Sequence, residues 1–359
     1  MSEPLTVVAL SGGVDSATAA AMLVEAGERV IAMTMRLYDA GGTQSSSGGR
    51  CCGPRDIEDA RQVATQLGIP FYVMDFSDEF AKHVVDDFVR EYASGRTPNP
   101  CVRCNEHIKF TPLLDAAKAL GADRLATGHY ARIIDHDGTL RLRRAVDAEK
   151  DQSYFLFNMP RSALARVVFP LGGLRKDEVR AHARRFGLVN ADKAESQEIC
   201  FVPDGNHAGF VAARALVRTG ALRAADGTEL GRHDGIHRYT IGQRRGIGVA
   251  AAAPLYVTAI DHATGDVTLG GADALMKDVL SVDALSWAGP APTGPLRASV
   301  QLRHRHAPAL ATIEADGLVA RVQLDRKERA VTPGQAAVFY GGVHGDEVLG
   351  GGFIRGEAP

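Results

Sequence analysis

The sequence feature that constrains the fold most is a glycine turn, Leu-Ser-Gly-Gly-Val-Asp-Ser at residues 10–16. Residues 5–10 are apolar with β-branched residues in the middle, which predicts a strand that leads into the turn. Residues 14–25 are rich in Ala, Met and Leu and contain no proline, which predicts a helix that follows it. Glycines let a ligand approach the backbone, and the unpaired N–H groups and dipole of the helix start attract negative charge. The turn therefore predicts a phosphate site.

The side chains of this turn refine the prediction. Ser11 and Ser16 can donate further hydrogen bonds to phosphate. Asp15 would repel phosphate, which indicates a bridging Mg²⁺ ion. The turn lacks the Gly-Lys-Ser/Thr ending of the Walker loop, so hydrolysis of a terminal phosphate is the less expected chemistry. The competing interpretation is an ordinary turn with a helix cap.

Alternating strands and helices continue through the first half of the chain. We expect strands at 29–37, 71–76 and 123–126, and helices at 54–67, 78–92 and 106–120. This alternation predicts an α/β fold with a parallel sheet covered on both faces, and a binding crevice at the C-terminal ends of the strands. Beyond residue 202 short strands dominate, at 255–260, 266–269, 296–306 and 336–340. We therefore predict a catalytic domain at 1–202, a small central domain at 203–278 and a C-terminal β-barrel at 279–359.

Charge and hydropathy exclude some classes of partner. Lys and Arg number 41 against 43 Asp and Glu, for a net charge of −2, so any nucleic-acid surface must be a local basic patch. No long apolar run and no signal sequence is present, which predicts a cytoplasmic protein without a membrane partner. The odd number of five cysteines favours reactive or metal-binding thiols over a disulfide framework.

Two cysteines follow an extended Thr-Pro-Asn-Pro segment as Cys101-Val-Arg-Cys104. A helix that starts near residue 106, together with Arg103, would favour a reactive thiolate at Cys104. The Cys-x-x-Cys spacing alone also fits a redox pair, half of a zinc site or two ligands of an iron–sulfur cluster.

The other cysteines carry weaker signals. Cys51 and Cys52 end a Gly- and Ser-rich segment, 39–53, that we expect to be mobile, and the sequence leaves their role open. Cys200 precedes a phenylalanine at the end of a glutamate-rich stretch, a setting that often holds a buried filler.

Two further polar clusters are candidates for binding. Gly128 and His129 follow the strand predicted at 123–126, where Gly128 could let a nucleotide approach and His129 could bind phosphate or cap the loop. Lys150-Asp151-Gln152 precede an aromatic cluster, and their plainest interpretation is a helix start capped by the aspartate.

Taken in order, SGGVDS, TPNPxxxC, TGHY, KDQSYFL and the glutamate-rich stretch ending in Cys200 resemble the bacterial tRNA-specific 2-thiouridylases of the PP-loop ATP pyrophosphatase superfamily. The resemblance continues through residues 239–246 and 332–340 and spans nearly the whole chain. It implies ATP-dependent 2-thiolation of the wobble uridine of tRNA, through adenylation of the uracil 2-carbonyl and release of AMP and pyrophosphate. ATP and Mg²⁺ are the implied cofactors. The implied partners are a tRNA anticodon loop and a persulfide sulfur-donor protein, with no DNA.

The resemblance also implies roles for individual residues. Cys104 matches the nucleophile and Cys200 the persulfide carrier, whose sulfur attacks the activated carbon directly or passes through Cys104, leaving a disulfide that a reductant reopens. The residues that match the ATP site are Ala9, Leu10, Ser11, Gly12, Gly13, Val14, Asp15, Ser16, Met35 and Gly128. The residues that match tRNA contacts are Asn99, Pro100, Cys101, His129, Lys150, Asp151, Gln152, Arg303, His304 and Gln335.

The strand predicted at 296–306 would place Arg303 and Arg305 on one face, and His304 and His306 on the other. Two arginines on one face could contact phosphates, although a solvated strand face is the commoner role for such a pattern. The resemblance favours tRNA binding, which should then weaken as salt rises.

One residue departs from the family pattern, which commonly has aspartate where this chain has Cys101. Cys101, Cys104 and Cys200 could instead hold a [4Fe–4S] cluster with one iron open for sulfide. The persulfide route is favoured because Cys104 and Cys200 suffice for it. Two other functions compete with thiolation: an amide-forming PP-loop ligase, which needs no paired cysteines, and a non-catalytic RNA-binding protein switched by nucleotide.

Overall fold

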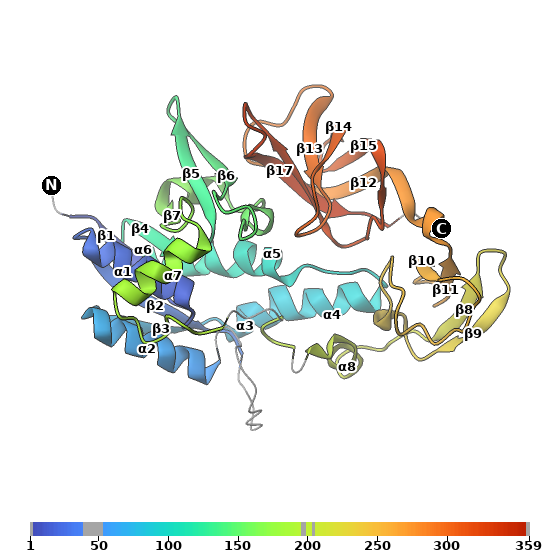
Figure 1. Cartoon of the computed structure of the whole chain (residues 1–359), viewed down its shortest axis with the longest axis horizontal. Coiled ribbons are helices and arrows are strands. Elements are labelled where there is room, and N and C mark those ends of the chain that lie inside the picture. Colours follow the sequence, from blue (N-terminus) through green and yellow to red (C-terminus); the bar gives the residue numbers. More distant parts are fainter. Residues whose placement is uncertain (1–2, 39–52, 195–198, 203–204, 357–359) are drawn as a thin grey trace. The chain divides into compact units, whose positions relative to one another are not determined.

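A computed structural model describes residues 3–38, 53–194, 199–202 and 205–356 of the chain (Figure 1). The chain divides into two compact units, one of Met1–Val84 with Cys101–Gly205 and one of Val85–Pro100 with Asn206–Pro359. The segment predicted to be mobile lies outside the described residues apart from its last position, and so do Cys51 and Cys52.

The first unit is built on a five-stranded parallel sheet in the order β3-β2-β1-β4-β7. Its strands are β1 (Leu5–Ala9), β2 (Arg29–Arg36), β3 (Phe71–Asp75), β4 (Arg124–Thr127) and β7 (Val167–Val168). Three of its helices are α1 (Val14–Glu25), α2 (Pro54–Leu67) and α7 (Lys176–Arg185). The parallel α/β fold is thereby confirmed, and α1 and α2 have the predicted bounds.

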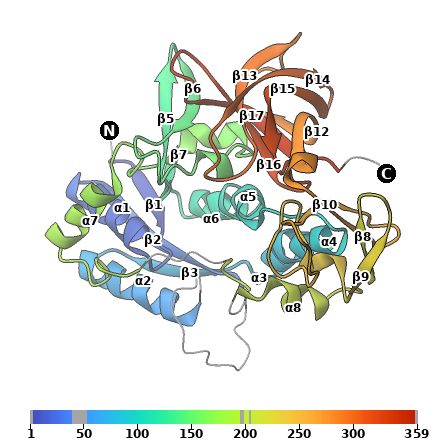
Figure 2. The same ribbon diagram turned by 45° about the vertical axis from the view of Figure 1, so that its right-hand side comes forward.

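The core on one face of this sheet explains the composition of α1. Val8 of β1 and Ala32 of β2 are fully buried against Ala17, Ala20 and other small residues of α1. The same cluster includes residues of α2 and α7, and both views place α7 alongside α1 (Figures 1 and 2). Small side chains let the first helix lie close to the strands, which fixes the position of the glycine turn before it.

The predicted helix at 78–92 is a run of three helical pieces: α3 (Ser77–Phe80), a π-helical turn η1 (Ala81–Val85) and α4 (Asp86–Ala93). The helix predicted at 106–120 was wrong in its start. Helical backbone begins with α5 (Pro100–Cys104), continues through a second π-helical turn η2 (Asn105–Lys109), and resumes in α6 (Pro112–Ala119). Proline is well suited to the first turn of a helix, so Pro100 starts this helix and does not merely extend the approach to it.

The rest of the first unit lies between β4 and α7. A hairpin is formed by β5 (Ala131–His136) and β6 (Thr139–Arg144). It is followed by two 3₁₀-helices, η3 (Ser153–Phe155) and η4 (Arg161–Arg166). The helix start predicted near Lys150 is therefore η3, and Asp151 accepts the backbone N–H of Ser153 there at 3.1 Å.

The second unit contains two sheets. A four-stranded sheet, in the order β10-β11-β8-β9, joins β8 (Gly220–Ala224), β9 (Glu229–His233), β10 (Tyr256–Ile260) and β11 (Val267–Gly270), with α8 (His207–Ala212) and η6 (Ile236–Arg238) nearby in the chain. After η7 (Ala272–Leu275), six strands form the barrel: β12 (Met276–Trp287), β13 (Leu296–Gln301), β14 (Ala309–Asp316), β15 (Val319–Arg329), β16 (Ala336–Gly341) and β17 (Glu347–Ile354). Antiparallel pairing of β12 with both β15 and β17 closes the barrel around an apolar core.

One strand prediction in the barrel was wrong. The strand expected at 296–306 ends at Gln301, and residues 303–305 form a turn in which the N–H of His306 donates to the carbonyl of Arg303 at 3.1 Å. Arg305 has a φ of 63°, far from the φ of about −120 to −140° of extended strand backbone. The alternation of arginine and histidine faces therefore does not hold, although Arg303 and Arg305 remain exposed.

Among the described residues, no helix combines the length and apolar character needed to cross a bilayer.

Candidate functional site

The glycine turn, called here the glycine loop (residues 10–16), follows the central strand β1. In the sheet, β1 lies between β2 and β4, and the chain leaves β1 toward β2 while β4 is added on the other side. The C-terminal ends of β1 and β4 therefore mark the point where the strand order reverses, which is where open α/β sheets bind ligands. The glycine loop and the segment after β4 meet at this point.

The loop is held in shape by its own serines. Ser16 Oγ accepts the backbone N–H of Ser11, lies 3.1 Å from Ser11 Oγ, and donates to the carbonyl of Gly13. Gly12 has a φ of +73°, and a Cβ there would overlap the backbone oxygen of Asp56 at the start of α2. The loop is thus seated on α2, and only glycine fits at residue 12.

Gly128 allows β4 to approach the same loop. A Cβ on Gly128 would lie 2.7 Å from the backbone nitrogen of Ser16. The other predicted ATP residues lie along the same sheet edge: Ala9 pairs with Met33 and Thr127, and Met35 is buried further along β2. The residues matched to the ATP site are therefore brought together by the fold.

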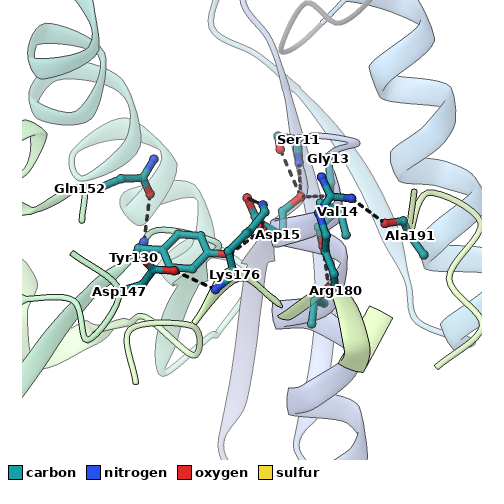
Figure 3. A network of polar contacts seen from close by, with 12 residues as sticks. Ser11, Gly13, Val14, Asp15, Tyr130, Asp147, Gln152, Lys176, Arg180 and Ala191 are labelled. Atoms are coloured by element: carbon teal, nitrogen blue, oxygen red, sulfur yellow. Dashed lines mark hydrogen bonds and ion pairs between the residues drawn. The ribbon is translucent and has the colours of Figure 1, made fainter. Parts of the chain in front are cut away.

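A lysine that sequence reasoning missed contacts the loop's carboxylate. Lys176, the first residue of α7, places Nζ 2.6 and 2.8 Å from the two carboxylate oxygens of Asp15. The Tyr130 hydroxyl donates to Asp15 Oδ1 at 2.8 Å. Figure 3 shows Lys176 and Tyr130 directed at Asp15 beside the glycine loop. The charge of Asp15 is thus compensated by protein groups.

A second missed lysine holds the loop's backbone. Lys193 Nζ lies 3.2 Å from the Gly12 carbonyl, 2.9 Å from Asp56 Oδ1 and 2.5 Å from Asp59 Oδ2, and Asn190 also donates to that carbonyl. Burial disfavours the ammonium charge, but the hydrogen bonds to the two aspartates outweigh burial and raise the pKa of Lys193. Lys193 therefore stays charged and fastens the glycine loop to the start of α2.

The segment that carries Cys104 is tied to the chain after β4. Asn105 donates to the carbonyl of Phe155 at 2.9 Å, and Lys109 Nζ lies 3.4 Å from His129 Nε2. Cys104 itself is partly exposed and ends α5. The predicted place of Cys104 near a helix start was wrong, because Cys104 ends α5. Arg103 pairs with Glu106 at 3.2 Å.

The segment that carries Cys200 lies at the end of β2. The hydroxyl of Tyr38 donates to the carbonyl of Cys200 at 2.9 Å, and Phe201 packs edge-on against Phe80 of α3 with ring centroids 5.5 Å apart. His83, one turn further along this helical run, stacks on His107 just after Cys104. Both cysteine segments therefore contact the α3–η1 run. The Cys200 segment lies near the end of β2 and the Cys104 segment is tied to the chain after β4, and these two strands flank β1 in the sheet.

Two predicted tRNA contacts, His129 and Gln152, lie next to Tyr130. His129 Nδ1 lies 2.7 Å from Thr127 Oγ1, and burial together with the Lys109 ammonium lowers the pKa of His129 well below 6.5. Because an ammonium only donates, Nε2 of the neutral ring accepts from Lys109 and Nδ1–H donates to Thr127. Gln152 exchanges hydrogen bonds with the backbone of Tyr130.

The neighbours of Gln152 differ in exposure. Lys150 is partly exposed, whereas Asp151 is buried. The Asp151 carboxylate accepts from Arg144, from Ser153 and from the backbone of residue 145. Asp151 therefore holds the backbone between residues 144 and 153 in place and does not face the solvent.

The remaining predicted tRNA residues lie in the second unit, apart from Cys101, which belongs to the first. Thr97 contacts two connecting segments of the second unit: its N–H donates to the carbonyl of Pro333, between β15 and β16, and its hydroxyl to Thr240, between η6 and β10. Gln335 donates to the carbonyls of Thr97 and Pro98 at 2.9 and 3.3 Å, and so fixes the approach to Asn99 and Pro100. Cys101, Arg303 and the partly exposed His304 lie at the surface.

Within the described ranges, no three His, Cys, Asp or Glu side chains are grouped so that they could hold a metal ion. Cys101, Cys104 and Cys200 are thus not assembled as cluster ligands, and the iron–sulfur alternative finds no support.

Comparisons with known proteins agree with this arrangement. Family models match residues 5–204, described as a tRNA methyl transferase HUP domain, residues 208–271, described as a tRNA methyl transferase PRC-barrel domain, and residues 277–354, described as an aminomethyltransferase β-barrel domain. The tRNA-specific 2-thiouridylase MnmA of Geotalea uraniireducens (strain Rf4) is 50% identical over 357 residues, 97% of this chain and 94% of that protein. The proteins of the same name from Solibacter usitatus (strain Ellin6076) and Mycolicibacterium gilvum (strain PYR-GCK) are 48% and 49% identical, covering 99% and 97% of this chain and 100% and 98% of their own. With these relatives spanning almost its entire length, the chain belongs to the family of enzymes named tRNA-specific 2-thiouridylases.

Proposed function

We propose that this chain transfers sulfur to the 2-position of the wobble uridine of tRNA, with ATP as the activating substrate. The observation that carries the proposal is the glycine loop at the reversal point of the sheet, with the Cys104 segment tied to the β4 side and the Cys200 segment to the β2 side. The names of the relatives supply the substrate class. A nucleotide site between two cysteine-bearing segments suits a reaction that activates a carbonyl and then delivers sulfur to it.

The glycine loop binds the phosphates of ATP through its backbone amides and the helix dipole of α1. Magnesium suits this site because Asp15 offers a partly exposed carboxylate in the first turn of α1, and Mg²⁺ is commonly held by one carboxylate together with substrate phosphates. Magnesium would neutralise the charge of the phosphates there. Gly128 and Met35 line the rest of the nucleotide site.

Activation precedes sulfur transfer because a uracil carbonyl is a poor electrophile. Its O2 attacks the α-phosphorus of ATP, the bond to the β-phosphate breaks, and pyrophosphate leaves. The product is a base whose former carbonyl oxygen belongs to an AMP leaving group. The base must leave the anticodon stack to react, which a single-stranded loop permits at modest cost.

Sulfur arrives as a persulfide on Cys200, supplied by a donor protein. Its terminal sulfur attacks C2, the C2–O bond breaks, and AMP leaves with the former uracil oxygen. The thiolate of Cys104 then attacks Sγ of Cys200, which releases 2-thiouridine and forms a disulfide between the two cysteines. The transferred sulfur is reduced as the two thiols are oxidised, and an external thiol reductant reopens the disulfide.

We propose that residues 1–202 form the catalytic domain, that 203–278 form the central domain, and that the barrel at 279–359 grips the tRNA. Arg303 and His304 provide contacts on the barrel, while Lys150, Gln152 and His129 provide contacts near the nucleotide. Gln335 acts on Asn99 and Pro100 by holding the segment before them. Cys101, exposed beside Cys104, faces the target base in this proposal.

The experiment is incubation of the full chain with ATP, Mg²⁺, a persulfide donor and unmodified tRNA, followed by mass spectrometry of the digested tRNA. The proposal predicts 2-thiouridine at the wobble position and AMP with pyrophosphate in solution. An amide-forming ligase would make AMP in Cys104→Ser and Cys200→Ser variants as fast as in the wild type when given its own substrate, and would leave uridine unchanged. A nucleotide-switched RNA-binding protein would bind tRNA without producing AMP.

A further inference from the structure

Lys176 contacts the glycine loop, and no role has yet been assigned to it. It comes from α7, far in the chain from the glycine loop, and its backbone N–H is anchored on Asp147 Oδ2 at 2.9 Å. Its ammonium contacts both oxygens of Asp15 and lies 5.7 Å above the ring of Tyr130. The side chain is only 12% exposed, so the ion pair is weakly screened by solvent.

The position of this ion pair is where a phosphate would bind. Asp15 lies in the first turn of α1, whose N–H groups face the ligand site. An ammonium less than 3 Å from Asp15 is therefore within reach of a phosphate held by that turn. Lys193, the other lysine at the glycine loop, already has three oxygens for its three N–H donors.

We propose that Lys176 binds the polyphosphate of ATP, and that its ammonium passes from Asp15 to phosphate oxygens when Mg²⁺ and nucleotide enter. Without nucleotide, Lys176 neutralises the carboxylate and keeps the glycine loop ordered. Asp15 would hold a divalent cation, and the ammonium of Lys176, repelled by the charge of that cation, would then turn to the nearest anion, which is the phosphate chain. This inference rests on the proposed use of ATP.

A purely structural role makes a different prediction, and the fold provides a matched control. The helices α1 and α7 are joined at their other end by Arg185, whose guanidinium pairs with both oxygens of Glu25 at 2.5 and 2.7 Å. If Lys176 only fastens α7 to α1, replacing Lys176 and replacing Arg185 should have similar effects on ligand affinity. If Lys176 binds phosphate, the two variants should differ in ligand affinity.

The test is calorimetric titration of the full chain with inorganic pyrophosphate and with ATP, each with and without Mg²⁺, without tRNA or sulfur donor. Lys176→Met should weaken both ligands by about 10- to 100-fold, the range for one charge-assisted hydrogen bond, whereas Arg185→Met should bind both as the wild type does. Asp15→Asn, which no longer competes for the ammonium, should bind pyrophosphate more tightly than the wild type without Mg²⁺ and should gain little when Mg²⁺ is added.

Urea unfolding of each variant identifies any that does not fold, and Asp15→Asn, which keeps Lys176, then tests the proposal separately. Wild-type affinity in Lys176→Met, or weaker Mg²⁺-free pyrophosphate binding in Asp15→Asn, would overturn the role of Lys176. If instead the wild type binds neither pyrophosphate nor ATP, the use of ATP itself fails. The two failures are therefore distinguishable.

Discussion

Replacing Gly12 by alanine should both destabilise the protein and remove its nucleotide site. Gly12 has a φ of +73°, and an alanine forced into this region costs about 1–2 kcal/mol. The added Cβ would also overlap the backbone oxygen of Asp56 and lie 2.9 Å from its Cα. Backbone atoms at a helix start cannot rotate away, so this overlap adds about 1–3 kcal/mol. We expect a total loss of about 2–5 kcal/mol in the free energy of unfolding.

Gly27 provides the matched control. Its φ is +79°, almost the same as that of Gly12, but a Cβ there would meet nothing within 4 Å. Gly27→Ala should therefore carry the backbone cost alone and keep its affinity for ATP. Urea unfolding measures the stability of both variants, and calorimetric titration with Mg-ATP measures their affinity. Equal stability losses in the two variants, with unchanged ATP affinity in Gly12→Ala, would refute the seating of the glycine loop on α2.

Three further predictions address the thiols, pH and salt. Cys104→Ser and Cys200→Ser should each abolish 2-thiouridine formation while retaining ATP binding, whereas Cys101→Ser should retain some thiolation; mass spectrometry of digested tRNA measures all three, and a fully active Cys200→Ser would remove the persulfide role. The pKa of His129 is lowered in the folded chain, so its contribution to stability is present above pH 6.5 and lost below it, as the unfolded chain takes up the proton. Urea unfolding at several pH values should show that His129→Gln loses less stability on acidification than the wild type does; identical pH dependence would contradict this. Arg303→Ala should weaken tRNA binding and reduce the slope of log affinity against log salt by about 0.7–0.9, the value for one phosphate contact, and an unchanged slope would place Arg303 outside the RNA interface.

Local patterns in the sequence were sufficient for most of the first unit. The helix at Val14–Glu25 follows a glycine turn and an apolar strand, and the helix at Pro54–Leu67 begins at a proline and ends before Gly68 in the left-handed conformation. The start and the end of a helix can be predicted in such cases because the residues that determine them are adjacent to the helix in the sequence. The prediction of a phosphate site at the glycine loop uses the same kind of local signal.

The errors arose where local signals were ambiguous. Pro100 was interpreted as part of an extended approach, but proline also suits a first helical turn, so the helix begins before Cys104 and not after it. Residues 302–306 alternate like a strand, yet the chain turns there and Arg305 takes a positive φ. Period-two patterns of charged residues occur in turns as well as in strands.

Lys176 and Lys193 could not be predicted because their partners are distant in the chain. Lys176 contacts Asp15 across 161 positions, and Lys193 contacts Gly12 across 181. The residues adjacent to each lysine in the sequence do not indicate which carboxylate it will contact in the fold.

The central claim is that the uracil oxygen attacks ATP before sulfur arrives, and one isotope measurement tests it directly. A tRNA carrying ¹⁸O at O2 of the wobble uridine is thiolated by the full chain with ATP, Mg²⁺ and a persulfide donor, and the released AMP is analysed by mass spectrometry. The account predicts one ¹⁸O atom in each AMP for each 2-thiouridine formed. Unlabelled AMP, with the isotope in water, would contradict it.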